Sequence, residues 1–262
     1  MAVKTRETRT RDRISIGPRA GAHDIIRLNN FYRGADTAEL LKAVLREKIA
    51  GDVALVSSFG AESAVLLDLV AGVDPAAAIF FLDTGKHFPE TLAYRDLLIE
   101  RLGLTNLVTL HPDAGEIAAR DDKGLRWSFD PDGCCDLRKV RPLEAALAPF
   151  DATISGRKAF QSSTRANLPM FELESATGRI KVNPLARWTV ADIAAHMDAR
   201  ALPAHPLVAQ GYPSIGCAPC TSKVQPGEDP RAGRWRGWDK TECGLHGEVK
   251  TMPPGPGEEP VF

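Results

Sequence analysis

The sequence predicts an α/β protein in which a parallel, twisted sheet carries helices on both faces. Two observations lead to this fold class. Short apolar runs alternate with helical patterns, and three of the four runs end in polar or glycine-containing turns. The chain has 262 residues, 44% hydrophobic and 26% charged, as expected of a soluble globular protein. Because ligands of such sheets bind beyond the carboxyl ends of the strands, the turns are the first place to look for a site.

Each predicted strand is a short apolar run that ends at a turn residue. Val53 to Val56 leads into Ser57, and Ile79 to Leu82 leads into Asp83. Continuous apolar runs of this length are typical of strands that are buried on both faces of a sheet. We predict strands over residues 53–57, 78–82, 106–110 and 152–156.

The helices are indicated by their caps and by the spacing of apolar residues. Asp36 is followed three residues later by Glu39, which is a helix-start signature. Pro89 is favourable at a first helical position, whereas Pro142 means that a helix either begins near Arg141 or bends there. We predict helices over residues 36–50, 63–70, 89–102, 113–123, 137–147 and 189–200.

Composition divides the chain into three segments. Residues 1–30 are predicted to be a basic, disordered arm, with a transit peptide as the alternative; residues 31–230 form the α/β domain, and residues 231–262 form a flexible C-terminal segment. The net charge of −1 gives no field that attracts nucleic acid or a membrane surface, and no apolar segment is long enough to span a bilayer. The odd number of cysteines, five, favours a reducing compartment, so we expect a cytoplasmic protein.

Four of the five cysteines occur in two tight pairs. Cys134 and Cys135 are adjacent, and Cys217 and Cys220 form a Cys-x-x-Cys motif. Four thiolates can hold a [4Fe–4S] cluster, in which each iron takes one ligand, or a tetrahedral zinc ion. Zinc sites are usually built from two Cys-x-x-Cys-type pairs, so the adjacent pair favours the cluster, and zinc is the alternative.

Two of the predicted turns could hold an anion. Ser57 to Ser63 offers hydroxyls, backbone N–H groups and a helix N-terminus. Residues 156–165 contain three cations and four polar side chains, and an arginine fork matches the oxygens of phosphate or sulfate. The structural alternatives are a simple capped turn for the first and a solvated surface loop for the second.

Taken together, these motifs resemble the assimilatory adenylyl-sulfate reductases, within the phosphoadenylyl-sulfate reductase superfamily of adenine nucleotide alpha hydrolase-like proteins. The resemblance extends from about Phe31 to His246, and its most specific parts are the paired cysteines and the sequence Glu-Cys-Gly-Leu-His at 242–246. The other matching segments are residues 57–62, 82–91, 138–139, 157–165, 231–235 and 240–241.

The resemblance implies a reaction and the residues that carry it. Adenosine 5′-phosphosulfate would be reduced to sulfite and AMP through an S-sulfocysteine on Cys243, with thioredoxin as electron donor. Lys139 and His246 would assist Cys243, and Lys240, three residues before it, is a further cation near that thiol. A [4Fe–4S] cluster would be held by Cys134, Cys135, Cys217 and Cys220. The residues implied to bind the substrate are Ser57, Ser58, Phe59, Gly60, Glu62, Leu82, Thr84, Gly85, Arg157, Gln161, Ser162, Arg165, Arg231 and Arg234.

Two alternatives to this function remain. Within the same family, the substrate could be the 3′-phosphorylated nucleotide, although reductases of that substrate usually lack the four paired cysteines. Outside it, the chain could be a zinc-bearing binding module. No nucleic-acid or membrane partner is expected, a homo-oligomer is left open, and Trp235 and Trp238 are interpreted as packing a small core rather than forming a lid.

Overall fold

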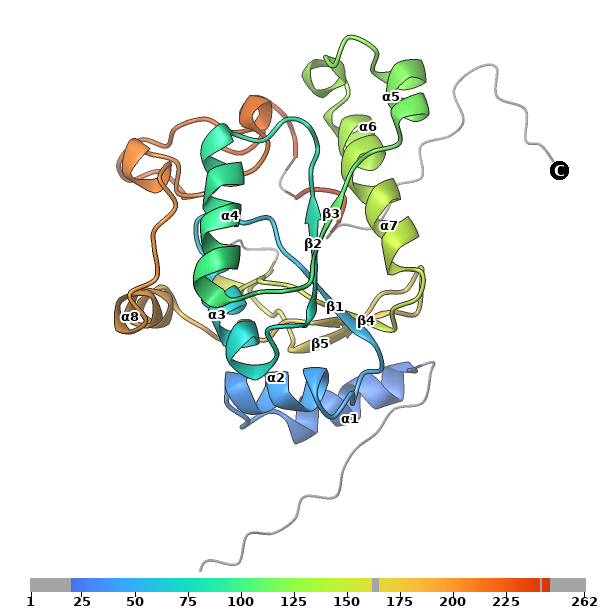
Figure 1. The fold of residues 1–262 in the computed structure, drawn as a ribbon, viewed down its shortest axis with the longest axis vertical. Coiled ribbons are helices and arrows are strands. Elements are labelled where there is room, and N and C mark those ends of the chain that lie inside the picture. Colours follow the sequence, from blue (N-terminus) through green and yellow to red (C-terminus); the bar gives the residue numbers. More distant parts are fainter. Residues whose placement is uncertain (1–19, 162–164, 241, 246–262) are drawn as a thin grey trace, which may run out of the picture.

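A computed structural model describes residues 20–161, 165–240 and 242–245, in which six strands form one sheet (Figure 1). The strand order is β3-β2-β1-β4-β6-β5, and all neighbours are parallel except the antiparallel pair β5 and β6. The predicted fold class is confirmed. The strands are β1 (Val53–Val56), β2 (Ala78–Leu82), β3 (Leu107–Leu110), β4 (Ala152–Ile154), β5 (Phe171–Leu173) and β6 (Ile180–Val182).

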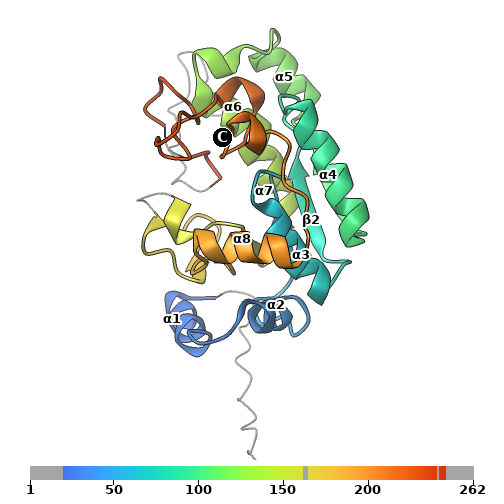
Figure 2. The same ribbon diagram turned by 90° about the vertical axis from the view of Figure 1, so that its left-hand side faces the viewer.

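The helices lie on both faces of the sheet, as Figures 1 and 2 show. The α-helices are α1 (Ala22–Phe31), α2 (Thr37–Leu45), α3 (Ser63–Val73), α4 (Pro89–Leu102), α5 (Ala114–Arg120), α6 (Pro131–Cys135), α7 (Arg141–Leu147) and α8 (Val190–Ala199). One π-helical turn spans Asp136–Val140, and short 3₁₀ turns span Arg126–Ser128, Ala159–Gln161, Val208–Gln210 and Ala218–Cys220. In this described part of the chain, no helix has the length and apolar character needed to cross a bilayer.

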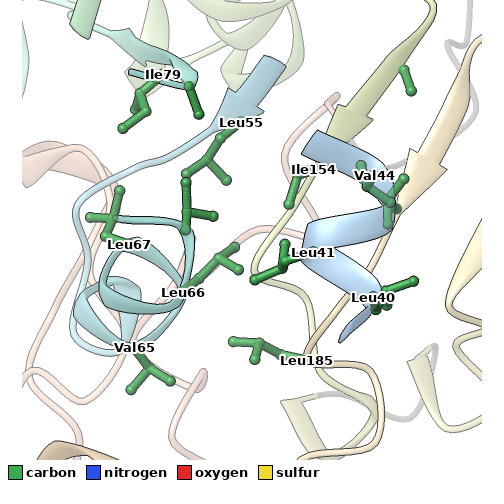
Figure 3. Packing of buried hydrophobic residues seen from close by; sticks show 14 of the residues in the cluster. Leu40, Leu41, Val44, Leu55, Val65, Leu66, Leu67, Ile79, Ile154 and Leu185 are labelled. Carbon is green, nitrogen blue, oxygen red and sulfur yellow. The ribbon is translucent and has the colours of Figure 1, made fainter. Parts of the chain in front are cut away.

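Alternate residues of the central strands pack against different layers. Leu55 of β1 and Ile79 of β2 belong to a large core that α2 and α3 cover, shown in Figure 3. Their neighbours Ala54 and Phe80 face the other side and pack with Leu143 of α7. Successive side chains of a strand point to opposite faces, so a strand with helices on both sides must be apolar at every position. This is why the continuous apolar runs predicted these strands correctly.

The side chains that begin the helices explain why several predicted starts are confirmed. Asp36 accepts a hydrogen bond from the backbone N–H of Glu39 at 2.7 Å, and Asp113 accepts one from that of Glu116 at 2.8 Å. Thr189 forms a reciprocal capping box with Asp192 at the start of α8.

Two predictions about local structure are wrong, and two strands were missed. Residues 22–30 belong to α1 rather than to a disordered arm, because Leu28 is buried in the core. α2 ends at Leu45 instead of reaching residue 50, and Lys48 has a positive φ of 52° that is incompatible with a helix. Strands β5 and β6 were not predicted, because three-residue strands with a central charged residue leave no apolar run.

The order in which the chain adds strands to the sheet reverses between β1 and β4. From β1 the chain adds β2 and β3 on one side, and then returns to add β4 on the other side. The two strands are in register, with Leu55 opposite Ile154, so the turns that follow them leave the same edge side by side. A crevice forms where successive connections diverge, and such points are the usual ligand sites of open α/β sheets.

A buried histidine gives the folded state a defined response to acid. His205 is 1% exposed; its Nδ1 accepts a hydrogen bond from the N–H of Leu207 at 3.2 Å, so Nε2 carries the proton and donates to Thr91 Oγ1 at 3.1 Å. Burial lowers the pKa of His205 from 6.5 to about 4. Between these values the unfolded chain binds a proton that the folded chain does not. The contribution of the neutral His205 to stability is therefore fully present above pH 6.5 and is lost as the pH drops towards 4.

We expect His205 to contribute up to about 3 kcal/mol to this loss of unfolding free energy between pH 6.5 and 4. Denaturant titrations across the range should show a shallower pH dependence for His205→Asn than for the unmodified protein. The exposed His23 provides the control, since His23→Asn should leave the slope unchanged. An unchanged slope in His205→Asn would contradict the assignment.

Candidate active site

A cavity of about 540 Å³ lies beyond the carboxyl ends of β1 and β4. The turns after these strands line it, and so do residues of the C-terminal segment, whose described backbone is drawn in red in Figure 2. The structure therefore brings together residues from five distant stretches of the chain. The predicted site residues that line this cavity are Ser57, Ser58, Gly60, Glu62, Leu82, Lys139, Arg157, Gln161, Arg165, Arg231, Arg234 and Cys243. Ser162 and His246 lie outside the described residues.

Three predicted substrate contacts do not line this cavity. Phe59 has a positive φ of 48° and is fully buried, with its ring packed edge-on against Phe81 at 5.5 Å, so its side chain belongs to the core. Thr84 is also fully buried, and Gly85 follows it in a tight turn. Both lie on the side of the paired cysteines rather than of the cavity.

A second, smaller pocket contains the four paired cysteines. All four are free thiols, and the elements that carry them are the α6 helix and the 3₁₀ turn Ala218–Cys220. Lys139, Arg234 and Trp235 line both this pocket and the large cavity, so they form the wall between them. The residues around this pocket are Thr84, Lys86, Trp127, Pro131, Cys134, Cys135, Arg138, Lys139, Cys217, Cys220, Arg234 and Trp235.

Crowding of the thiols disfavours their ionisation at three positions. Burial raises the pKa of Cys134 and of Cys220 to about 11, and the charges of the neighbouring cysteines raise both further. Burial also raises the pKa of Cys135. In the absence of a compensating charge, such thiols are poor nucleophiles and remain protonated.

A lysine in the shared wall acts against this trend. Burial alone would raise the pKa of Cys217, but the Lys139 ammonium and a hydrogen bond with Thr84 Oγ1 at 3.3 Å outweigh it, so that pKa is lowered. Burial would likewise lower the pKa of Lys139, but the charges of Cys217, Cys243 and Cys135 overcome it and raise that pKa. Lys139 therefore stays charged between the cysteine pocket and Cys243.

Two buried donors in the shared wall fit an anionic group among the cysteines. Arg234 Nε and Trp235 Nε1 have no hydrogen-bond partner, and both residues line the cysteine pocket. The Arg234 guanidinium stacks on the Trp235 ring at 4.4 Å and passes so close to Gly216 that a Cβ there would lie 2.2 Å from Nη2. No three His, Cys, Asp or Glu side chains in the described ranges are arranged to hold a single metal ion.

A buried ion pair fixes the helix that carries Cys134 and Cys135. Arg138 donates to Asp121 Oδ2 through Nη2 at 2.6 Å and through Nε at 3.1 Å, and its Nη1 donates to the carbonyl of Thr84 at 2.9 Å. The side chains of Arg138 and Asp121 are only 9% and 2% exposed. The pair thus ties the π-helical turn to the end of β2, next to Cys217. Sequence reasoning missed Asp121, because no spacing connects it to Arg138.

A polar network links the turn after β1 to the turn after β4. Lys158 Nζ donates to Glu62 Oε2 at 2.8 Å, and Gln161 Nε2 donates to the same oxygen at 3.0 Å. Gln161 Oε1 in turn accepts from Arg165 Nη1 at 2.6 Å. Lys158, a buried member of this network, was not predicted as a site residue. Arg157 lies at the edge, where its guanidinium pairs with Glu172 and contacts Ser155 and Asn183.

Contacts with the rest of the protein hold the C-terminal segment as far as Lys240, three residues before Cys243. Trp235 is 3% exposed, and its backbone N–H donates to the Cys220 carbonyl at 3.0 Å. Trp238, in contrast, is 43% exposed. Lys240 pairs with Asp132 and lies over the Trp235 ring. Residues 231–240 and 242–245 of the segment predicted to be flexible thus include these contacts, and its flexibility stays a prediction.

We expect Asp121→Asn to lower the free energy of unfolding by about 3–5 kcal/mol, because it leaves the Arg138 charge buried without its partner. The exposed neighbour Asp122 is the matched control, and Asp122→Asn should change stability by no more than about 0.5 kcal/mol. Denaturant unfolding of the two variants checks this. Equal effects would mean that the buried pair does not stabilise the fold.

Comparison with known proteins identifies the relatives of this chain. The family model described as the phosphoadenosine phosphosulfate reductase domain matches residues 52–223. A protein of Mesorhizobium japonicum named adenosine 5′-phosphosulfate reductase is 52% identical over 219 residues, 84% of this chain and 85% of that protein. A protein of Gloeobacter violaceus named phosphoadenosine 5′-phosphosulfate reductase is 45% identical over 78% of this chain and 88% of its own length.

A solved structure agrees with these relatives. The phosphoadenylyl-sulfate reductase of Candida auris, determined as a phosphate complex, superimposes with a TM-score of 0.67 and 27% identity, covering 80% of this chain and 100% of that one. The family model covers more than half of the chain, and the 52% identical relative spans most of both sequences. The chain therefore belongs to the phosphoadenosine phosphosulfate reductase family.

Proposed function

We propose that this protein reduces adenosine 5′-phosphosulfate to sulfite and AMP, with thioredoxin as the electron donor. One observation carries the proposal. Cys243 lines a cavity beside the point where the strand order reverses, and Lys139 lines both this cavity and the pocket of four cysteines. The names of the relatives support this reaction class. Cytoplasmic location remains a prediction from the sequence.

The cavity offers polar groups that suit the parts of such a substrate. The hydroxyls of Ser57 and Ser58 and the start of α3 line it, where they can donate to a phosphate. Lys139, Arg231 and Arg234 line the same cavity with Cys243, and these cations would hold the oxygens of the sulfuryl and phosphoryl groups. A nucleotide bound in this way would present its terminal sulfur to the thiol.

The first chemical step is a displacement at sulfur. The Cys243 thiolate attacks the sulfuryl sulfur, an S–S bond forms, and the S–O bond to the phosphate breaks. AMP leaves with the electron pair of that bond, and Cys243 carries the sulfonate as S-sulfocysteine. Lys139 and the two arginines stabilise the negative charge that develops on the sulfonate and phosphate oxygens.

The second step requires an external thiol. The other four cysteines lie in the separate pocket, so none of them is the second thiol of this reaction. A thiolate of thioredoxin attacks Cys243 Sγ and expels sulfite, which takes the electron pair of the S–S bond, so sulfur(VI) becomes sulfur(IV). The second thiol of thioredoxin then attacks the mixed disulfide and releases Cys243 as a thiol.

We further propose that the four-cysteine pocket holds a [4Fe–4S] cluster. Cys134, Cys135, Cys217 and Cys220 would be its ligands, and the unpartnered donors of Arg234 and Trp235 would face it. When bound, it would supply a fixed negative charge and a rigid cross-link between α6 and the Cys-x-x-Cys turn. Electron transfer by the thiols needs no redox change of this group.

We expect Cys243→Ser to lower thioredoxin-dependent sulfite formation by at least about a thousandfold, because the nucleophile is lost. Nucleotide affinity, measured by equilibrium binding, should stay within a factor of about two, since the cations of the cavity are unchanged. Each assay uses adenosine 5′-phosphosulfate and its 3′-phosphorylated form in parallel. Faster turnover of the latter would favour the alternative substrate, and turnover retained by the variant would contradict the role of Cys243.

Metal analysis of protein purified without oxygen tests the cofactor. We expect roughly four irons and four sulfides per chain, with the brown colour of an iron–sulfur protein. Cys135→Ser should lose both, whereas Cys243→Ser should keep both, because only the first removes a ligand. Zinc in place of iron and sulfide would support the binding-module alternative and contradict the cluster.

A further inference from the structure

Glu242, the residue before the reactive cysteine, is bound by two arginines of the cavity. Arg165 donates to it through both prongs of its guanidinium, from Nε to Oε1 at 2.8 Å and from Nη2 to Oε2 at 2.7 Å. Arg231 Nη2 also donates to Oε2, at 3.3 Å. The side chains of Arg165 and Glu242 are 8% and 15% exposed, so water screens this pair poorly.

The position of Arg165 is fixed independently of Glu242. Its Nη1 donates to Gln161, and Gln161 donates to Glu62, which the buried Lys158 also holds. This chain of hydrogen bonds starts on the turn after β1 and ends at the guanidinium. Arg165 therefore presents its two remaining donor groups in one direction, where a planar carboxylate can meet both.

We propose that Glu242 is a positioning residue that docks the C-terminal segment, so that Cys243 is held in the cavity beside Lys139. In this proposal Arg165 serves the protein's own carboxylate rather than the substrate. Lys139 and Arg234 face the substrate, and Arg231, which also reaches Glu242, is shared between the two. A docked thiol meets bound substrate as an intramolecular reactant, which is the kinetic advantage of the arrangement.

The opposite role would be that of a plug. A carboxylate on two arginines resembles an anionic ligand, and a plug would have to leave before the substrate could bind. The docking role and the plug predict opposite effects on substrate affinity when Glu242 loses its charge. The proposal rests on the proposed function only for the reaction of Cys243, because the docking itself can be measured without any substrate.

The first experiment measures docking directly. A maleimide attached to a large polyethylene glycol labels Cys243 only when the segment has left the cavity, and peptide mapping identifies the modified cysteine whatever the state of the other four. We expect Glu242→Gln to raise the labelling rate roughly 10- to 100-fold, since a hydrogen-bonded charge pair is lost. Glu228→Gln is the matched control, because it breaks an exposed pair with Arg236 in the same region and should leave the rate unchanged.

The second experiment uses a double-mutant cycle. Arg165→Gln should raise the labelling rate like Glu242→Gln, and the double variant should be no faster than either, because both act through one contact. Thermal unfolding of all variants should give the same midpoint within a few degrees. Additive effects of the two substitutions, or a labelling rate equal to that of the unmodified protein, would overturn the proposal.

Single-turnover kinetics separate docking from substrate binding. With adenosine 5′-phosphosulfate, Glu242→Gln should slow formation of the S-sulfocysteine adduct roughly 10- to 100-fold while nucleotide affinity changes less than about twofold. Tighter nucleotide binding with a faster adduct would identify a plug and overturn the docking role. If the unmodified protein forms no adduct at all, the proposed function fails, whereas the labelling experiment still decides whether Glu242 docks the segment.

Discussion

The electrostatic interaction between the Lys139 ammonium and the thiols around it is the one on which the rest of the site depends. Several thiols lie near one another, and each negative charge among them raises the pKa of the next. Lys139 reverses this for Cys217, and the charge of Cys243 is among those that raise the pKa of Lys139. Because it lines both the large cavity and the cysteine pocket, one cation serves two sets of sulfur atoms. A neutral side chain at this position would remove the largest favourable charge at Cys217, where Arg234 also lowers the thiol pKa.

The irregular helix around residue 138 makes this placement feasible. Pro142 has no N–H, so the regular hydrogen bond back to residue 138 cannot form, and the chain there adopts the wider π-helical turn Asp136–Val140. Consecutive helical residues point in different directions. Arg138 therefore reaches Asp121 and the end of β2, while Lys139 reaches the shared wall. One short stretch thus both fastens the cysteine pocket and supplies its cation.

The C-terminal segment completes the site through contacts with the Cys-x-x-Cys turn. An isolated bridge joins Thr221 and Arg234, and the Trp235 N–H bonds to the Cys220 carbonyl. These contacts carry Arg234 over Gly216, a position where a side chain would displace the guanidinium. The position of the reactive thiol at the end of this segment therefore depends on the same turn that carries two of the paired cysteines. Glu242 adds a second attachment, to Arg165 after β4.

The sequence alone determined the alternating architecture, because a strand covered on both faces must be apolar throughout, and Val53–Val56 and Ala78–Leu82 are. It also determined the cysteine motifs, twelve of the residues that line the cavity, and helix starts such as Asp36, where the cap acts within one turn. It could not reveal the three-residue strands β5 and β6, the Asp121–Arg138 pair or the attachment of Glu242 to Arg165. The partners are 17 residues apart in the first pair and 77 in the second, and no local pattern records which side chains the fold will bring together. Only the tertiary structure decided that an arginine expected to hold the substrate holds the protein's own carboxylate, because that depends on where the end of the chain returns to the sheet.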